Sequence, residues 1–507
     1  MVDISTILAG LVDAFTLTNI LFVLAGVIIG QFVGAMPGIG PVVTMAIAIP
    51  FTFVLSPLPA IGFLIGINKG GLIGGAIPAI LLNAPGTPDA AATAIDGYPL
   101  TKKGKPIQAM KMALYSSVTG DTFSDLVLIT VAAPLAVWAL QMGPVEIFAL
   151  MIFAFSLISG LIGTSVTRGI IAVALGLLVA TVGLDPEHST PRFLFGNFEL
   201  YDGFPIAAVA IGSLAVSEIL LRLAKLRGDM RPSVHIPRNQ TPDHKNVTFA
   251  QYWACKFVLM RGAFIGTFIG AVPGMGSTAA GFLSYASTKQ AAKDPESFGK
   301  GDLRGIAASE SANSSVSGAD MIPLLALGLP GSASSALLIS AFLIQGIEPG
   351  PLIFEQQGQL IYGLFGAMIL ANICNLTCGF FGLRLWSRLI TAPESVVFSV
   401  SLILCIVGVY LSTGSTFGVY VMLFFAIFGM GMKTLGYPTV VFIIAFFLGP
   451  RFELSMGQTA TILQGDAANL INHPVAIALL MMSVFSIYYL GFRPLRNSKK
   501  KAVTTKS

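Results

Sequence analysis

Charged residues are scarce in this sequence of 507 residues. They make up 10% of it, whereas a typical soluble domain contains about 25%. Hydrophobic residues make up 54%, and apolar runs long enough to cross a bilayer recur along the whole chain. The composition excludes an ordinary soluble protein. It predicts an all-α integral membrane protein with about 11–14 transmembrane or re-entrant helices.

Cysteine and histidine are also rare, with four residues of each. Cys255, Cys374, Cys378 and Cys405 lie in apolar segments without a CxxC pair, and the histidines show no metal-ligand spacing. The sequence contains no GxxxxGK[ST] loop that would bind the phosphates of ATP. We therefore expect no metal centre, no cofactor, no ATP-driven step and no enzymatic activity.

Two stretches interrupt apolar helices with a proline followed by glycine. The first, GVIIGQFVGAMPGIG (26–40), and the second, GAFIGTFIGAVPGMG (262–276), are identical at nine of their fifteen positions. Such a break leaves backbone N–H and C=O groups without partners, which is costly in hydrocarbon. A break that occurs twice is therefore expected to have a function.

A second broken element follows each of these stretches. AIPAILLNAPGTPDAA (76–91) aligns with MIPLLALGLPGSASSA (321–336), so that the Pro-Gly pair at 85–86 matches the pair at 330–331. Chance similarity between glycine-rich apolar segments is the alternative, and the same order of two breaks in both halves argues against it. Repeated interrupted helices are typical of the binding site of a secondary transporter.

The distribution of charge predicts that the two halves are inverted in the membrane. Basic loops mark the cytoplasmic side. They occur at 101–111, 222–245, 289–304 and 493–506. In each half, one loop lies between the first break and the second. This loop is uncharged near 51–60 in the first half and basic at 289–304 in the second half. After the second break the pattern reverses, because 101–111 is basic and 346–359 is acidic.

This orientation gives a domain plan with the N-terminus outside. We expect a first repeat over 1–224, a basic cytoplasmic linker over 225–250, a second repeat over 251–492 and a basic cytoplasmic tail over 493–507. Four spans are expected near 112–140, 145–160, 165–182 and 204–222. Five more are expected between 359 and 493.

The breaks also predict where a ligand binds. Helix N-termini offer N–H groups to an anion, and unwound carbonyl groups bind cations. The predicted substrate-binding residues are Gly38, Gly40, Asn68, Lys69, Asn83, Gly86, Thr87, Gly274, Ser277, Thr278, Asn313, Gly331, Ser332 and Ser334. Pro41 is expected to be the first residue of the helix that follows the first break. The hydroxyl groups are expected to cap helices or to bind ligands. The alternative is that the small and hydroxyl residues serve close helix packing.

Lys69 is the one cation in the apolar stretch GFLIGINKGGLIGG (62–75). An ionisable residue within a membrane is by default a functional hypothesis, so we predict that Lys69 pairs with a substrate carboxylate. The alternative is a lysine whose stem is buried and whose ammonium reaches the interface. Glu310 and Asp320 flank the equivalent place in the second half.

Longer motifs resemble one family of transporters. AILLNAPGTPDAAATAIDGYPLTKKGK (79–105), FGKGDLRGIAASESANSSVSGADMIPLLALGLPGSASSALLISAFLIQGIEPGPLIF (298–354) and the two PGxG elements resemble the large membrane subunit of tripartite tricarboxylate transporters, the TctA family. The resemblance covers nearly the whole chain. It implies a multi-pass secondary transporter of the bacterial inner membrane that imports di- or tricarboxylates by symport with Na⁺ or H⁺.

The same resemblance implies two protein partners. These are a small four-helix membrane subunit and a periplasmic solute-binding protein that delivers the substrate; no nucleic acid is implied. At three places the sequence departs from the family pattern, because Asn68–Lys69 replaces an aromatic pair, Pro78 a serine and Ser309 a proline. The resemblance therefore does not extend to a citrate-like specificity. A membrane-embedded enzyme and a channel are the alternative functions.

Overall fold

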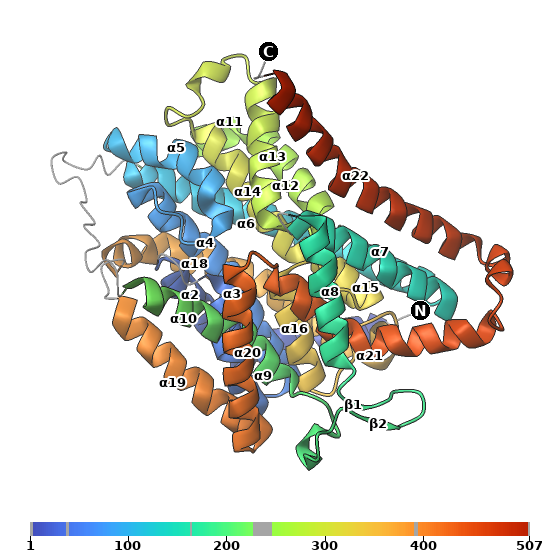
Figure 1. The fold of residues 1–507 in the computed structure, drawn as a ribbon. Helices are drawn as coiled ribbons and strands as arrows, with labels where there is room; N and C mark the ends of the chain where they lie inside the picture. Colours follow the sequence, from blue (N-terminus) through green and yellow to red (C-terminus); the bar gives the residue numbers. More distant parts are fainter. Residues whose placement is uncertain (1–3, 37–39, 163–164, 227–245, 390–393, 505–507) are drawn as a thin grey trace. The chain divides into compact units, whose positions relative to one another are not determined.

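Helices dominate the structure (Figure 1). The computed structural model describes residues 4–36, 40–162, 165–226, 246–389 and 394–504, and it is 81% helical. The short strands β1 (Gly183–Leu184) and β2 (Pro191–Arg192) pair antiparallel. The predicted all-α class is confirmed, apart from this strand pair.

Seven helices of the described residues are long and apolar enough to cross a membrane. They lie at Leu17–Gly34, Pro57–Leu82, Pro106–Ala139, Ile206–Ala224, Gly358–Gly382, Thr416–Thr434 and Thr439–Ile462. Shorter apolar helices occur between them, including Pro41–Val54 and Ala333–Ile344. The chain is therefore a multi-pass membrane protein. The inverted arrangement of its two repeats stays a prediction.

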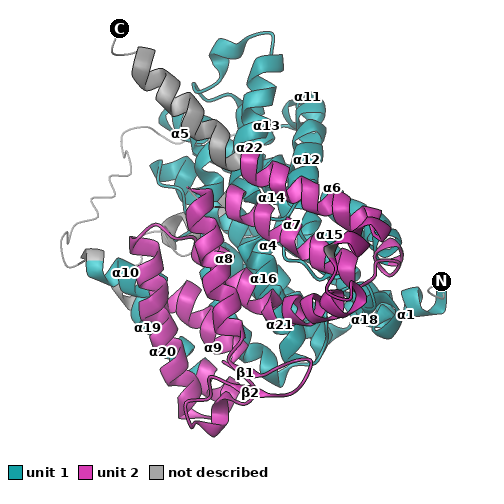
Figure 2. Cartoon of the chain, turned by 45° about the vertical axis from the view of Figure 1, so that its right-hand side comes forward, with its two compact units in different colours: residues 1–136, 218–408 teal, residues 137–217, 409–507 magenta. Residues whose placement is uncertain are grey.

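The chain folds into two compact units (Figure 2). Unit 1 consists of residues 1–136 and 218–408, and unit 2 of residues 137–217 and 409–507. Each unit therefore takes segments from both halves of the chain. The plan of two sequence repeats, a linker and a tail is a separate question and stays a prediction; residues 227–245 of the linker lie outside the described residues.

The elements of unit 1 before residue 137 are α1 (Ile4–Ala14), α2 (Leu17–Gly34), α3 (Pro41–Ala48), η1 (Ile49–Val54), α4 (Pro57–Leu82), η2 (Pro88–Ala90), α5 (Ala91–Lys102) and most of α6 (Pro106–Ala139). Those after residue 217 are most of α10 (Ser217–Leu226), then α11 (Phe249–Ala254), α12 (Lys256–Gly270), α13 (Gly276–Ala291), η5 (Pro295–Ser297), α14 (Leu303–Ala319), α15 (Met321–Leu327), α16 (Ala333–Ile344), α17 (Ile353–Gln356), α18 (Gly358–Leu389) and most of α19 (Glu394–Thr413).

The remaining elements belong to unit 2. They are α7 (Pro144–Ile162), α8 (Val166–Ala180), β1, β2, η3 (Phe198–Leu200), α9 (Ile206–Ala210), the π-helix η4 (Ile211–Val216), α20 (Thr416–Thr434), α21 (Thr439–Ile462), η6 (Ala467–Asn472) and α22 (Pro474–Thr504). Helices α6, α7, α8 and α9–η4–α10 lie where four spans were expected. Helices α18 to α22 lie where five were expected.

Glycines allow α2 to lie directly against α4. A Cβ atom at Gly26, Gly30 or Gly34 would come within 2.2–2.4 Å of carbonyl oxygens of α4. In the second half, a Cβ atom at Gly266 of α12 would lie 2.1 Å from the carbonyl oxygen of Ala312 in α14. These glycines, none of which is a predicted binding residue, therefore serve close helix packing.

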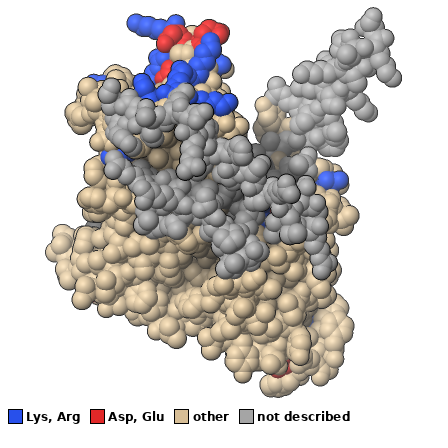
Figure 3. All heavy atoms as spheres, turned by 90° about the vertical axis from the view of Figure 1, so that its left-hand side faces the viewer, with Lys and Arg blue, Asp and Glu red and all other residues tan. Residues whose placement is uncertain are grey.

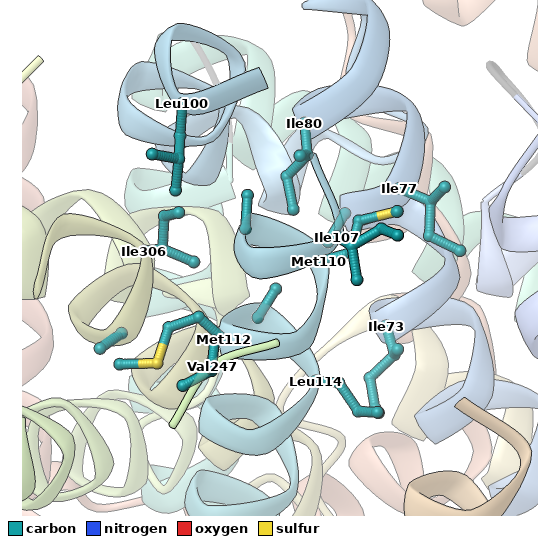
Figure 4. Close-up of a cluster of buried hydrophobic side chains, with 14 of the residues drawn as sticks. Ile73, Ile77, Ile80, Leu100, Ile107, Met110, Met112, Leu114, Val247 and Ile306 are labelled. Atoms are coloured by element: carbon teal, nitrogen blue, oxygen red, sulfur yellow. The ribbon is translucent and has the colours of Figure 1, made fainter. Parts of the chain in front are cut away.

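Apolar side chains from several helices form the core beside these packed pairs (Figure 4). Ile73, Ile77 and Ile80 lie on one face of α4 and approach Met110 and Leu114 of α6. The spacing of three or four residues places them on one helix face, and their burial favours the folded state by about 1.5–3 kcal/mol for each side chain. This core fixes α6 against α4.

In unit 2, α8 packs against α21 and α20 packs against η4. Glycine again permits close contact, since a Cβ atom at Gly176 would lie 2.3 Å from the carbonyl oxygen of Phe442, and one at Gly212 would lie 2.3 Å from that of Met422. The rings of Phe425 and Phe442 are buried between these helices. Unit 2 is thus an apolar helical body.

A loop of unit 1 is anchored by one buried carboxylate of α5. Asp96 Oδ1 accepts hydrogen bonds from the backbone N–H groups of Gly299, Gly301 and Asp302 at 2.9, 2.8 and 2.8 Å. Asp96 Oδ2 accepts one from the hydroxyl group of Tyr285 at 2.8 Å. These bonds satisfy the buried carboxylate and attach the α13–α14 loop to the first-half helix α5.

The same loop carries an ion-pair cluster. Arg304 contacts Asp294 at 2.8 Å and Asp302 at 2.6 Å. Burial by itself would raise the pKa of Asp302, but hydrogen bonds from Arg304 and Ser297 outweigh it and hold that pKa below its usual range. On the face drawn in Figure 3, charged side chains gather at one end, and most of the remaining surface that is coloured carries few.

Candidate functional site

All four predicted breaks occur in unit 1. The first lies between α2 and α3, and α3 begins at Pro41 as expected; Gly38 lies outside the described residues. Its second-half counterpart lies between α12 and α13. The other two breaks lie between α4 and η2 and between α15 and α16. The helices are therefore interrupted at the places that the sequence indicated.

The equivalent breaks after α4 and α15 have the same local geometry. Asn83 ends α4 with φ 55°, and the aligned residue Gly328 ends α15 with φ 72°. Both are left-handed C-cap positions, which favour glycine and tolerate asparagine. Because the Asn83 side chain is also exposed, its local role is that of a helix cap. Its predicted role in binding stays a prediction.

The residues that follow these two breaks are also equivalent. The hydroxyl group of Ser332 caps α16, because its oxygen accepts a hydrogen bond from the backbone N–H group of Ser335. The same hydroxyl group donates a hydrogen bond to Asp320. The aligned hydroxyl group of Thr87 lies against Gly75, the counterpart of Asp320. Thr87 is buried, and its Oγ1 atom has no hydrogen-bond partner among the described residues.

Contacts connect the four breaks into one group, the ring of breaks. Gly40 approaches Thr87, since a Cβ atom at Gly40 would lie 3.7 Å from Thr87 Cγ2. Thr278, in the first turn of α13, donates a hydrogen bond to Asp89. Gly274, with φ 94°, donates its N–H group to the carbonyl oxygen of Gly331 at 2.9 Å. Finally, α16, which begins at the fourth break, packs against α3, which begins at the first.

Equivalent helices make equivalent contacts around this ring. Helix α5 packs against α13 and α14, and its counterpart α16 packs against α3 and α4. Four helices, α3, α13, α5 with its initial turn η2, and α16, begin at the breaks. Ser277 and Ser334 lie half-buried in the first turns of α13 and α16. The predicted residues of these turns are therefore close to the ring.

Two predicted asparagines lie deeper, in the helices that lead to the breaks. Asn68 of α4 and its counterpart Asn313 of α14 are both buried. Neither amide atom of Asn313 has a hydrogen-bond partner in the part of the chain that is described. An unpaired buried amide is costly, so Asn313 stays a candidate for binding a ligand or ion.

Lys69 of α4 lies in a buried ionic cluster. Its Nζ atom is 2.8 Å from Asp125 Oδ2 and 3.3 Å from Asp121 Oδ1, and it donates to Asn372 Oδ1 at 2.9 Å. All three charged side chains are 1% exposed. The alternative, in which the ammonium reaches the interface, is therefore wrong. A direct contact between Lys69 and the substrate stays a prediction.

Further polar side chains extend this cluster. Ser317 of α14 donates to Asp121 Oδ1 at 2.6 Å, and Asn372 Nδ2 donates to Asp125 Oδ2 at 2.7 Å. The two aspartates were missed from the sequence. They lie four residues apart in an apolar helix, so the rule that ionisable residues inside membranes are functional candidates would have found them.

Glu310, a buried carboxylate of α14, has a different environment. It accepts hydrogen bonds from the hydroxyl groups of Thr93 and Ser117. The side chains of Ile77 and Met110 also line its surroundings. Among the described residues, it takes part in no ion pair. Glu310 therefore lies apart from the cluster of Lys69.

Comparison with known proteins identifies the family. The family model described as "Tripartite tricarboxylate transporter TctA family" matches residues 20–444. The chain belongs to this family. It is 33% identical over 501 residues, 98% of either chain, to "Uncharacterized 52.8 kDa protein in TAR-I ttuC' 3'region" of Agrobacterium vitis.

A second similar protein covers part of this TctA-family chain. "Uncharacterized protein in TAR-II ttuC' 3'region", also of Agrobacterium vitis, is 32% identical over 238 residues, which are 47% of this chain and 98% of that protein. No solved structure matches the chain. The TctA match confirms the family recognised from the motifs, and the chain is a membrane subunit of the tripartite tricarboxylate transporter type.

Proposed function

We propose that this TctA-family protein is the large membrane subunit of a binding-protein-dependent secondary transporter. It imports small organic anions, di- or tricarboxylates, across the bacterial inner membrane, and Na⁺ or H⁺ moves with them. The observation that carries this proposal is the ring of four breaks, because it brings the beginnings of four helices together in one compact unit.

The ring favours an anionic substrate. Each helix beginning presents backbone N–H groups and the positive end of the helix dipole, and both attract carboxylates. In this proposal, Gly40, Gly86, Gly274 and Gly331 allow the substrate close to the backbone, and the nearby Ser and Thr hydroxyl groups supply further donors. Gly38, Asn68, Asn83 and Asn313 complete the proposed site.

Two carboxylates beside the ring favour symport with a cation. Asp89 contacts Thr278 at the start of α13, and Asp320 contacts Ser332 at the start of α16. Their negative charge opposes the binding of a substrate carboxylate unless a cation is also bound. Cation symport therefore supplies both the driving force and the local charge balance.

Uptake into proteoliposomes tests the proposal. The protein is reconstituted with its small four-helix subunit and the periplasmic binding protein, and labelled citrate, succinate and malate are offered under imposed Na⁺ or H⁺ gradients. We expect saturable accumulation of at least one acid that requires the binding protein. Flux that neither saturates nor needs the binding protein would indicate a channel. Chemical conversion of the acid would indicate an enzyme.

Cysteine labelling tests the inverted topology. In a variant without native cysteines, single cysteines at Lys103, Arg238 and Lys293 are expected to react only with reagent added at the cytoplasmic side. Cysteines at Pro57 and Gln356 are expected to react only from outside, because the loops of opposite charge lie on opposite sides. Labelling of Pro57 and Lys293 variants from the same side would contradict the inverted repeats.

A further inference from the structure

The ionic cluster of Lys69, Asp121 and Asp125 is not balanced in charge. It contains one ammonium and two carboxylates, each 1% exposed. If both aspartates are ionised, the cluster carries one net negative charge in a buried environment, which is strongly unfavourable. Asp320, which directly follows α14 and interacts electrostatically with Lys69 and Asp121, is also a carboxylate and increases the excess.

The hydrogen bonds distinguish the two aspartates. Asp125 Oδ2 accepts one hydrogen bond from the ammonium group of Lys69 at 2.8 Å and another from the side-chain amide of Asn372 at 2.7 Å. Asp121 Oδ1 accepts a hydrogen bond from the hydroxyl group of Ser317 and lies 3.3 Å from the ammonium nitrogen of Lys69. Asp121 Oδ2 and Asp125 Oδ1 are both buried without a hydrogen-bond partner among the described residues, so the two groups differ in their distance to the ammonium. Asp125 is therefore the closer ion-pair partner, and Asp121 is the less stabilised anion.

We propose that Asp121 takes up one exchangeable proton at Oδ2 while Asp125 stays ionised beside Lys69, and that this proton is the cation coupled to anion import. The inference rests on the proposed function. Binding converts the Asp121 carboxylate and H⁺ into a carboxylic acid, so that the cluster becomes neutral. Release on the other side of the membrane restores the carboxylate and completes the cycle.

A proton suits this place better than a metal cation. A hard metal cation takes about six oxygen ligands, whereas a proton requires one. The ammonium of Lys69 lies within 3.3 Å of both carboxylates and would repel a second cation at the same place. Among the described residues, no group of three His, Cys, Asp or Glu side chains could hold a metal ion.

The cluster is also connected to the ring of breaks. Ser317, which donates to Asp121, lies in α14, and Asp320 follows three residues later and accepts the hydroxyl group of Ser332 at the fourth break. Asn313 lies one turn before Ser317 on the same helix. A change of charge at Asp121 therefore acts on the helix that carries these residues.

The test compares Asp121→Asn with the matched control Glu310→Gln in proteoliposomes that contain both partner proteins. With one proton per substrate, an inward gradient of one pH unit raises the accumulation ratio of the transported acid by up to about tenfold. We expect the Glu310→Gln variant to keep this response. We expect the Asp121→Asn variant to lose it and still to exchange labelled for unlabelled acid across the membrane.

Infrared difference spectra between acidic and alkaline pH give a second measurement that requires no transport. One component of the protonated-carboxyl band is expected in the wild type and in Glu310→Gln, and that component should be missing in Asp121→Asn. A band that is lost in Glu310→Gln alone, or uptake that responds to a Na⁺ gradient and not to pH, would overturn the proton inference and leave the proposed transport intact. Failure of the wild type to accumulate any of the three acids, with the Asp121 band present, would overturn the proposed function instead.

Discussion

Lys69→Met is expected to lower the free energy of unfolding by about 3–5 kcal/mol, because it leaves the carboxylate of Asp125 buried without its cation. The ammonium and the carboxylate are 2.8 Å apart and are both 1% exposed. Thermal unfolding in detergent, followed together with assembly with the small subunit, measures the effect. Lys69→Arg keeps the charge and should have a smaller effect.

Two further variants separate the possible causes. Lys300→Met is the control, because its exposed ammonium lies 4.0 Å from Glu296 and such surface pairs contribute at most about 1 kcal/mol. The double variant Lys69→Met/Asp125→Asn should recover most of the lost stability, since Asp121 is then the only carboxyl group left in the cluster and is neutral when protonated. Unchanged stability of Lys69→Met would show that Asp125 is not ionised in the folded protein.

The double variant also tests the predicted contact between Lys69 and the substrate. If the ammonium binds a substrate carboxylate directly, the double variant folds and its apparent KM rises roughly tenfold or more, since a charge-assisted hydrogen bond is lost. If Lys69 acts only as the counter-charge of the aspartates, the KM stays close to that of the wild type. Initial rates of uptake over a range of substrate concentrations distinguish the two results.

Gly86→Ala is the second substitution with a large expected effect. A Cβ atom there would lie 2.4 Å from the carbonyl oxygen of Gly34 and 3.0 Å from Gly75 Cα, and backbone atoms cannot move aside as a flexible side chain does. We expect the two first-half breaks to be forced apart. The expected cost is about 1–3 kcal/mol in stability, together with loss of transport, because the first two breaks, from which helices α3 and α5 begin, no longer meet.

Matched variants make this result specific. Gly331→Ala is the second-half equivalent, since its Cβ atom would lie 2.9 Å from Asp320 Cβ, and we expect the same loss. Gly431→Ala in α20 is the control, because no atom lies within 4 Å of its Cβ position. Unfolding temperature and uptake are measured for all three. If both Gly86→Ala and Gly331→Ala took up substrate like the wild type, the proposal that the ring forms part of the binding site would be wrong.

Much of the helical framework could be predicted because its signals are local. Apolar length places a helix in a membrane wherever it later packs, so the spans near α6 to α10 and from α18 to α22 were expected. A Pro-Gly pair interrupts a helix through the backbone of the residues concerned. The breaks and the first turn at Pro41 were therefore visible before any tertiary contact was known.

Some residues at the breaks and in the repeated motifs are explained by their surroundings. Asn83 has the polarity of a ligand residue, but its left-handed φ of 55° makes it the cap of α4. Gly30 and Gly34 belong to a conspicuous repeated motif, yet their neighbours are carbonyl oxygens of α4. Residue type alone does not separate ligand binding from packing, because both require small or polar residues at a break.

The sequence by itself determined the membrane class, the family and the positions of the four breaks, because apolar length and Pro-Gly pairs act over a few neighbouring residues. Only the tertiary structure decided which groups surround Lys69. Its partners Asp125 and Asn372 are 56 and 303 residues away, on α6 and α18. An isolated cation became part of a buried ionic cluster because the packing of three helices, rather than the local sequence, determines which charges share the low-dielectric interior.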